Sequence, residues 1–446
     1  MYNFPDGLYT DVRTEDVFST DIVYTIGSVD DRKEKQYNAS FIRMFDGNRW
    51  YYSVTTSTGQ VQEEIDRLAA LAEKNHGIDR HRYLKNLQIS KGEYLKFADH
   101  PVSETAIEEK DSLLKSFFPV INETGPITAW KMIYKDLRKV KEFYSSKGSE
   151  LVFDSQHCGY ALSFQMSDKK ERFFKESFQC GENYFSDIPG ETETLRRFLD
   201  HCVNFMNTAE PVQPGKYPVV LSPKVAGVFA HESFGHKSEA DFMLGDEQMK
   251  KDWEIGKQIG EDFLSIVDDG NELGIGFTPF DDEGTAASKT YLIKNGKLSG
   301  RLHSTATAAE MEENVTGNAR AVGFEYEPVV RMTTTYIEPG DIGKKELLSS
   351  VSRGIYIDSI RHGSGMSTFT LAPARAFRIE NGEIGNPVSV SVVTGNVFRT
   401  LQEIEGVSDK LELFSFVGGG CGKMEQFSLP VGFGGPYVKV KSMDVQ

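Results

Sequence analysis

The sequence predicts an α+β protein of two domains, on the basis of three observations. A chain of 446 residues exceeds what one hydrophobic core usually organises. Strand and helix patterns alternate over the first half, whereas strand patterns dominate the second. Prolines and glycines at residues 210–218 interrupt both patterns and predict a linker. We therefore expect a mixed α/β domain, with helices on a sheet, at residues 1–210, and a mostly antiparallel β domain at residues 211–446.

Hairpin and helix signals define the elements of the N-terminal domain. Asp46-Gly47-Asn48 lies between two segments of β-forming residues, 39–43 and 50–54, which predicts a hairpin. Apolar side chains then recur at helical spacing from Val61 to residue 71 and predict a helix. Further along we expect a helix at 129–144, strands at 150–165 and a helix at 191–206.

Two Asn-Gly pairs indicate the β structure of the C-terminal domain. Asn295-Gly296 and Asn381-Gly382 each separate short β-forming segments, which is the pattern of tight hairpins. Glycine is dense at residues 418–435. We expect two helices in this domain, at residues 225–236 and 304–312.

Composition and charge disfavour several classes of function. The formal net charge is −16 and the pI is about 5.2, so the acidic surface disfavours direct binding of nucleic acid. No apolar stretch is long enough for a membrane span, and residues 1–14 do not resemble a signal peptide. The four cysteines are few and scattered, which fits a reducing compartment. We therefore expect a cytoplasmic protein without membrane attachment.

The clearest chemistry lies in His231, Glu232 and His236, which form an H-E-x-x-x-H motif. Two imidazoles and an adjacent carboxylate can supply two metal ligands and a general base. In the familiar H-E-x-x-H motif the histidines differ by about 40° around a helix, whereas the longer spacing here gives about 140°. Both can reach one metal only if the helix widens or ends between them, and Gly235 is the expected place. Otherwise the two histidines are unrelated.

A third ligand has to come from another part of the chain, because a catalytic zinc site usually has three protein ligands. Cys421 lies in a Gly-Gly-Gly-Cys-Gly-Lys segment, where glycines permit close approach of the backbone and Lys423 would favour the thiolate. A lone cysteine in such a turn is also often a small buried thiol. Glu239 and Asp241 are further candidate ligands, or acids that face solvent.

Several segments together resemble one protein family. Residues 228–241 (VFAHESFGHKSEAD) look like the metal motif of TldD-type peptidases, and residues 421–436 look like their cysteine segment. Between them, four shorter motifs recur in the family's order: Asp281-Asp282-Glu283-Gly284-Thr285, Thr316-Gly317-Asn318, Arg331-Met332-Thr333 and Gly354-Ile355-Tyr356. The sequence thus resembles the TldD/PmbA family, also called modulators of DNA gyrase, over residues 215–446. Only the layout is similar over residues 1–210.

The resemblance implies that His231, His236 and Cys421 hold one transition-metal ion in the C-terminal domain. Zn²⁺ is the expected metal, and this ligand set also suits iron. Glu232 is then the catalytic acid/base. Family members form homodimers, or heterodimers with a related subunit that lacks the metal motif, so this chain resembles the catalytic subunit. Family chains commonly open with a helix, whereas this sequence begins in or near its first strand.

We therefore expect metal-dependent hydrolysis of peptides or unfolded protein segments, with Glu232 as general base. A β-rich domain can bind such a chain at a sheet edge through main-chain hydrogen bonds. One alternative is a metal-free cysteine hydrolase with Cys421 as nucleophile, which leaves Glu232 without a role. Another is a non-catalytic protein-binding regulator, similar to the gyrase modulation with which the family is linked by name.

Overall fold

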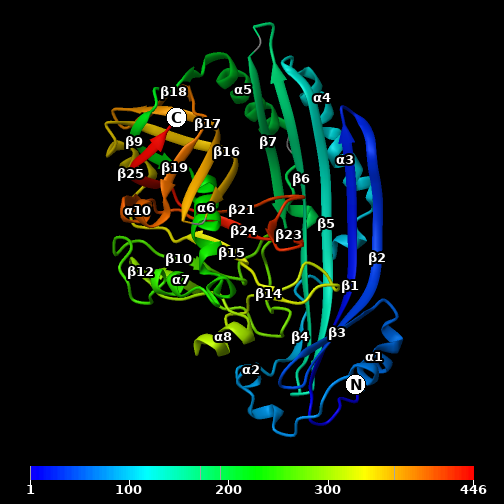
Figure 1. The fold of residues 1–446 in the computed structure, drawn as a ribbon. Coiled ribbons are helices and arrows are strands. Elements are labelled where there is room, and N and C mark those ends of the chain that lie inside the picture. The colour runs from blue at the N-terminus through cyan, green and yellow to red at the C-terminus, as the bar shows by residue number, and fades with distance from the viewer. Residues whose placement is uncertain (1, 171, 191, 366) are drawn as a thin grey trace.

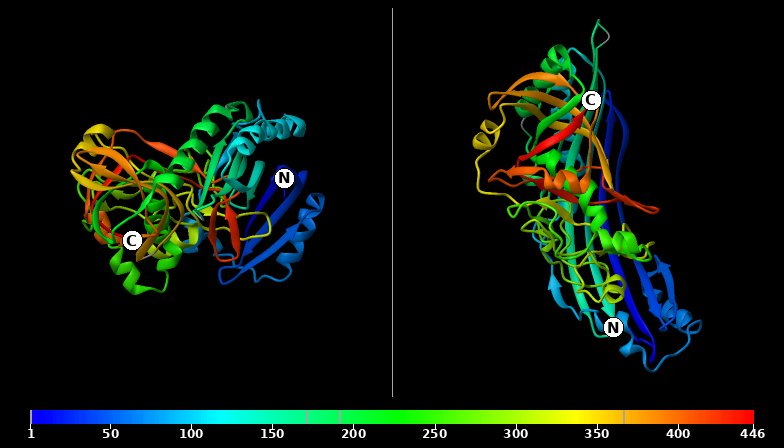
Figure 2. Two further views of the ribbon diagram at one scale, coloured as in Figure 1. Left: turned by 90° about the horizontal axis from the view of Figure 1, so that it is seen from above. Right: turned by 60° about the vertical axis from the view of Figure 1, so that its left-hand side comes forward.

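The computed structural model describes residues 2–170, 172–190, 192–365 and 367–446 and has two parts (Figures 1 and 2). One part is a sheet with very long strands, and the other is a compact β-rich unit beside it. Helices and extensive sheets are both present, which confirms the α+β class. In the described residues, no helix has the length and apolar character that crossing a membrane requires.

Seven strands form the N-terminal sheet, in the order β3-β2-β1-β5-β6-β4, with β7 also paired to β6. β1 pairs with β2, and β5 with β6, as long antiparallel ladders. The strands are β1 (Tyr9–Thr25), β2 (Ser28–Phe45), β3 (Trp50–Thr55), β4 (Lys91–Tyr94), β5 (Ile127–Ser145), β6 (Glu150–Ser167) and β7 (Phe173–Glu182). The predicted hairpin at Asp46-Gly47-Asn48 is confirmed as the connection between β2 and β3.

Helices cover one face of this sheet. Leu114, Phe117 and Leu199 from the helices share a hydrophobic cluster with Trp130 and Tyr160 from the strands. The helices of this part are α1 (Val61–Ala69), α2 (Arg82–Lys85), α3 (Ile107–Ser116), α4 (Phe118–Glu123) and α5 (Thr192–Thr208). The predicted helices that begin near residues 61 and 191 are therefore confirmed as α1 and α5.

The helix predicted at residues 129–144 is wrong, because this segment is strand β5. Its side chains alternate between the two faces of the sheet, with Trp130, Met132 and Tyr134 buried against the helices. Further along the strand the buried positions include Lys139 and Lys141. These inward lysines hide the two-residue period, since lysine normally marks a solvent-exposed position.

Two larger sheets form the C-terminal part, and antiparallel pairs dominate both. The eight-stranded sheet contains β8 (Glu210–Pro211), β9 (Gly215–Leu221), β16 (Arg353–Gly365), β17 (Thr368–Glu380), β18 (Glu383–Ser389), β19 (Val393–Asn396), β20 (Ile404–Val407) and β25 (Val438–Val445). The six-stranded sheet contains β12 (Lys297–Leu298), β11 (Thr290–Lys294), β10 (Ile266–Asp268), β15 (Thr334–Ile337), β24 (Gly432–Gly435) and β21 (Glu412–Ser415), in this order. Two short pairs complete the part: β13 (Ala319–Arg320) with β14 (Val329–Val330), and β22 (Cys421–Lys423) with β23 (Gln426–Leu429).

Both predicted Asn-Gly hairpins are confirmed. Asn295-Gly296 joins β11 to β12 and Asn381-Gly382 joins β17 to β18. Both residues of each pair have positive φ, 50° and 73° in the first turn and 51° and 82° in the second. Tight hairpin turns require such angles, and asparagine and glycine tolerate them best.

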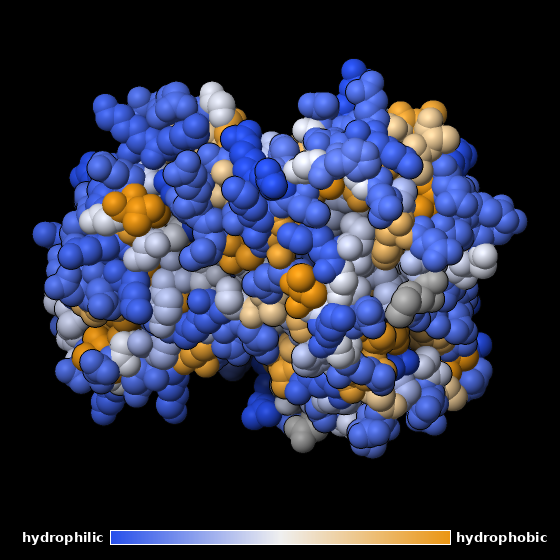
Figure 3. Space-filling model, turned by 90° about the horizontal axis from the view of Figure 1, so that it is seen from below, coloured by the Kyte–Doolittle hydropathy of each residue, from blue (hydrophilic) through white to orange (hydrophobic). Residues whose placement is uncertain are grey.

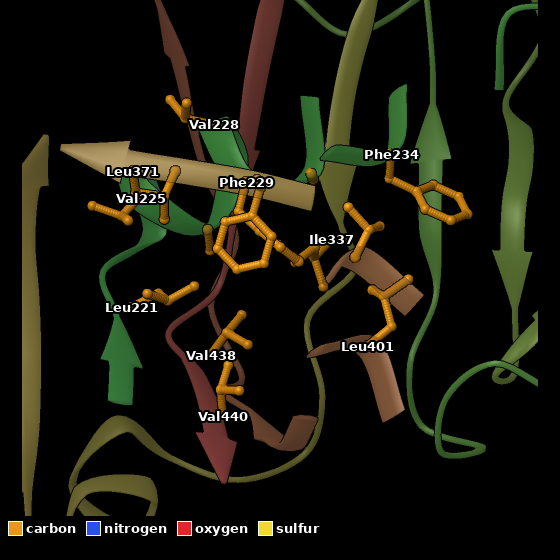
Figure 4. Packing of buried hydrophobic residues seen from close by; sticks show 14 of the residues in the cluster. Leu221, Val225, Val228, Phe229, Phe234, Ile337, Leu371, Leu401, Val438 and Val440 are labelled. Atoms are coloured by element: carbon orange, nitrogen blue, oxygen red, sulfur yellow. The ribbon is translucent and has the colours of Figure 1, made fainter. Parts of the chain in front are cut away.

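Helix α6 (Pro223–Ala230) lies at the centre of the C-terminal part (Figures 1 and 4). Val225 and Phe229 point into a core that also contains Leu371, Val438 and Val440 (Figure 4). The other helices here are α7 (Glu247–Asp252), α8 (Thr305–Met311), α9 (Lys344–Ser349) and α10 (Val397–Gln402), of which α8 was predicted. Because α6 is enclosed on several sides, the segment that follows it has a fixed position.

The face of the molecule shown in Figure 3 is mainly hydrophilic, with small separate hydrophobic patches.

Candidate metal centre

The two histidines of the H-E-x-x-x-H motif lie where α6 changes its helical geometry. Residues His231–Gly235 form one π-helical turn, in which the His236 N–H donates to the His231 carbonyl. This i→i+5 bond brings the two rings together, with centroids 5.1 Å apart. The widening that both histidines require is therefore present. Gly235 is the last residue of this turn and packs closely against Met332, whose sulfur would collide with a Cβ at this position.

Cys421 reaches the histidines from β22, a strand of a short hairpin. Its Sγ lies 3.4 Å from Nε2 of His236. One donor atom from each of His231, His236 and Cys421 lies within 4.8 Å of the other two. The structure thus brings together the three residues that the sequence suggested as ligands, although 185 residues separate His236 from Cys421.

Contacts within this cluster stabilise charge on Cys421 and His236. Burial raises the pKa of the Cys421 thiol, but hydrogen bonds from His231 and His236 outweigh burial and lower it to about 5. Burial lowers the pKa of His236, but its contacts with Cys421 and Glu239 raise it to about 10. The sequence suggested that Lys423 favours the thiolate of Cys421. In the structure, the two histidines favour it instead. A thiolate is the form of cysteine that binds metals.

The donor set fits a transition-metal ion. Nδ1 of His231 is buried and has no hydrogen-bond partner among the described residues. Buried polar nitrogens nearly always have a partner, and a metal ion is one that an imidazole lone pair can bind. Two imidazoles and one thiolate suit zinc, and they also suit iron. His231, His236 and Cys421 are therefore the residues that could hold the ion.

Glu232 lies next to this cluster without belonging to it. Its half-buried side chain lines a cavity of about 160 Å³ together with His231, His236 and Cys421. The remaining walls are mainly apolar: Val228, Phe416, Val431 and Phe433. Within the described part of the chain, no hydrogen bond or ion pair involves the Glu232 carboxylate, so it can accept a proton from a molecule in the cavity.

Glu239 and Asp241, the other candidate ligands, lie behind His236 rather than in the cluster. Oε2 of the fully buried Glu239 is 3.3 Å from Nδ1 of His236 and 3.1 Å from Nζ of Lys423. Lys423 also donates to both oxygens of Asp241, at 2.7 and 2.8 Å. Lys423 and Cys421 belong to the same strand, so this ion-pair network connects the cysteine strand to the histidine segment.

The sequence did not predict that Glu239 supports His236 or that Lys423 pairs with Glu239 and Asp241. A carboxylate that accepts from Nδ1 of a histidine leaves Nε2 to face a metal, which is a common support for metal ligands. The signal for Glu239 was its position three residues after His236, close enough to contact the ring. The aromatic walls Phe416 and Phe433 had no comparable signal in the sequence.

This cavity combines three potential metal ligands with a glutamate whose carboxylate has no hydrogen-bond partner among the described residues. Such a site is typical of metalloenzymes, and the chain is a candidate member of that class. The model of the PmbA/TldA metallopeptidase C-terminal domain matches residues 214–446. The chain therefore belongs to the PmbA/TldD family, which confirms the resemblance of its motifs.

Curated relatives carry protease names. A metalloprotease of Synechocystis sp. is 40% identical over 350 residues, which cover 77% of this chain and 74% of the relative. A zinc metalloprotease TldD homolog of Saccharolobus solfataricus is 28% identical and covers 98% of this chain and 96% of the relative.

Solved structures share the fold. A proposed modulator of DNA gyrase from Thermotoga maritima has a TM-score of 0.76 and 19% identity, with 99% of this chain and 96% of that chain covered. TldE from Thermococcus kodakarensis has a TM-score of 0.75 and 15% identity, with 98% and 96% covered.

Proposed function

We propose that this protein is a metal-dependent peptidase that hydrolyses peptides or unfolded protein segments. One observation carries the proposal. The potential ligand atoms of His231, His236 and Cys421 lie within 4.8 Å of one another, and Glu232, whose carboxylate has no hydrogen-bond partner among the described residues, lines the same cavity. The relatives named metalloprotease and zinc metalloprotease support it.

In this proposal His231, His236 and Cys421 hold one transition-metal ion, for which we propose zinc. A bound zinc ion supplies Lewis-acid chemistry, because it polarises a carbonyl group and lowers the pKa of water. Glu232 accepts the proton of the attacking water and then gives it to the leaving amine. The apolar walls Phe416 and Phe433 limit the access of bulk water to this exchange.

The substrate in this proposal is an extended chain. β21 is the last strand of the six-stranded sheet, and a cavity of about 430 Å³ lies along residues Glu412–Ser415. The next residue, Phe416, lines the metal cavity. A peptide added to the outer edge of β21 would therefore be directed toward Glu232. Main-chain pairing of this kind tolerates many side chains and selects unfolded segments.

We also propose a dimer, either of two copies or with a related subunit that lacks the metal motif. A peptidase for unfolded chains needs to keep folded proteins away from its site, and a second subunit over the cavity does so. The acidic net charge of −16 argues against nucleic acid as a direct partner.

The non-catalytic regulator remains the alternative function. Its support is the name of the Thermotoga maritima structure, and a likeness at 19% identity concerns the fold alone. A cysteine hydrolase would use Cys421 without a metal, so a chelator separates it from the peptidase, because only the metal-dependent enzyme loses activity.

A pair of substitutions tests the proposal. Glu232→Gln keeps the size of the side chain and removes the base, so we expect retained metal and peptide binding but cleavage at least about a hundredfold slower. His231→Ala should lose metal and activity together. Glu247→Gln, an exposed glutamate of α7, is the matched control and should behave as the wild type.

Each contrary result has a distinct meaning. Near wild-type cleavage by Glu232→Gln with metal in place would show that Glu232 is not the base. Loss of metal in Glu232→Gln would make Glu232 a ligand, and the structure then offers no other carboxylate among the described residues that line this cavity as the base. Wild-type protein that binds peptides and metal but never cleaves would favour the regulator.

A further inference from the structure

A second cavity, of about 50 Å³, lies between the long sheet and the C-terminal part. Lys139, Lys141 and His157 line it from β5 and β6, and Asp282 and Arg320 line it from the C-terminal part. Leu429 and Pro430 also contribute to its wall, whereas the next residue, Val431, lines the metal cavity. One short segment therefore borders both cavities.

Buried positive charge exceeds negative charge around this cavity. Four cations, Arg13, Lys139, Lys141 and Arg320, are each at most 9% exposed. Their carboxylate partners among the described residues are Glu15 and Asp282. Arg320 donates instead to the backbone carbonyls of Met332 and Pro430. Three cations thus share two carboxylates, and Arg320 has no carboxylate partner among the described residues.

A wider count gives a smaller excess. Arg331, Asp268 and the Cys421 thiolate are the next charged groups that act on Arg320, and they add one positive and two negative charges. Arg331 is fully buried and donates to the carbonyls of Cys421 and Gln426. A surplus of one positive charge therefore remains, in a chain whose overall charge is −16.

His157, which also lines the cavity, adds no positive charge to it. Burial lowers the pKa of His157, and the nearby Lys139 and Arg320 lower it further, to about 4. The imidazole is consequently neutral at physiological pH and does not add to the positive charge. Burial also lowers the pKa of Arg320, to about 10, and Arg331 contributes to that shift.

The cavity has the size and the free donors that a small anion needs. Burying a charge without a counter-charge is costly, so buried charges are normally paired. A lysine ammonium has three donors, and Lys139 uses two of them, on Glu15 and on the Val322 carbonyl. A single water needs roughly 10–15 Å³ on this measure, so about 50 Å³ admits a group of a few atoms.

We infer that this cavity binds a small anion of carboxylate size, held by Lys139, Lys141 and Arg320. The anion has two potential sources with the same chemistry: a free small carboxylate, or the terminal carboxylate of a peptide. This site is distinct from the metal cluster, and the inference does not depend on the proposed peptidase activity.

Thermal unfolding in chloride-free buffer tests the inference. The sodium salt of HEPES, a bulky sulfonate without a carboxylate, is replaced stepwise by sodium acetate at constant ionic strength and pH. A ligand that binds only the folded state raises the melting temperature in a saturable manner. We expect a rise of about 2 °C in the wild type. Equal melting temperatures in the two salts would overturn the inference.

Two lysine variants test whether the acetate-dependent rise in melting temperature comes from this cavity. Lys139→Met keeps the apolar stem and removes one of the three proposed anion ligands, so it should lose the acetate-dependent rise. Lys110→Met is the matched control: Lys110 is fully buried, pairs with Asp136 at 2.8 Å and does not line the cavity. It should be less stable but keep the rise. An equal rise in Lys139→Met and in the wild type would place the anion elsewhere and refute the site.

Two further measurements do not depend on whether Lys139→Met folds. Wild-type crystals soaked in bromide should show an anomalous peak between Lys139 and Arg320, and an empty cavity would contradict the inference. Peptides with a free or an amidated C-terminus, tested on Glu232→Gln protein to prevent cleavage, distinguish the sources. Stabilisation by the free acid alone identifies a peptide terminus, and stabilisation by acetate but by neither peptide identifies a free anion.

Discussion

Glu239 should control metal affinity without binding the metal, and Glu239→Gln is the substitution that tests this. The carboxylate is fully buried and lies 3.3 Å from Nδ1 of His236. It favours the tautomer with the proton on Nδ1, which directs Nε2 toward Cys421. A glutamine amide can donate to Nδ1 as well as accept from it, so it does not enforce this tautomer.

The expected magnitude follows from the bond that is lost. A hydrogen bond to a charged group contributes about 1.5–3 kcal/mol. At about 1.4 kcal/mol per factor of ten, this corresponds to roughly 10- to 100-fold in affinity. Substitutions of residues that support metal ligands typically cost the same range. We therefore expect Glu239→Gln to bind zinc about 10- to 100-fold more weakly than the wild type.

Competition against a chromophoric chelator, starting from metal-free protein, measures this affinity without any peptidase assay. The cobalt-substituted protein adds a spectroscopic measurement, because a changed orientation of His236 shifts the visible absorption bands. Glu283→Gln is the matched control, since Glu283 is also a buried glutamate in an ion pair, with Arg43 at 2.8 Å. It should lower stability and leave zinc affinity unchanged. Wild-type affinity and an unchanged cobalt spectrum in Glu239→Gln would refute the positioning role.

Two further predictions concern the ligand set and the assembly. Cys421→Ser should lower the zinc content of purified protein sharply, because a hydroxyl is a much poorer zinc ligand than a thiolate; elemental analysis measures this, and full occupancy would remove Cys421 from the site. Sedimentation should give a dimer at micromolar concentration, and an active monomer would disprove the proposed enclosure of the site.

The candidate ligands could be predicted from the sequence because their chemistry is unusual. His231, Glu232 and His236 form a rare motif, whereas Cys421, a lone cysteine among glycines, was assigned as the third ligand through the resemblance to the family. The motif also predicted the local geometry, since a spacing of five residues on a regular helix would place the histidines on nearly opposite sides. The roles of Glu239 and Lys423 could not be predicted, because β22 and the π-helical turn meet only in the folded chain.

Strand β5 shows why part of the fold escaped prediction. Trp130, Met132 and Tyr134 alternate as expected of a strand, but Lys139 and Lys141 occupy inward positions farther along. Local patterns assign lysine to solvent, whereas these lysines face Glu15 and Asp282 inside the protein. Only tertiary contacts between distant segments make buried lysine favourable, and a local pattern contains no information about them.

The separation of 185 residues between His236 and Cys421 has a consequence for biosynthesis. At a typical rate of 5–20 residues per second, the ribosome adds the cysteine roughly 10–40 s after the histidines. During this interval the nascent chain offers two imidazoles, which bind a metal ion only weakly. In the proposed metalloenzyme, tight binding has to wait until the hairpin with Cys421 has emerged and packed against the π-helical turn. The choice among metal ions is then made by the folded C-terminal part rather than by the H-E-x-x-x-H segment alone.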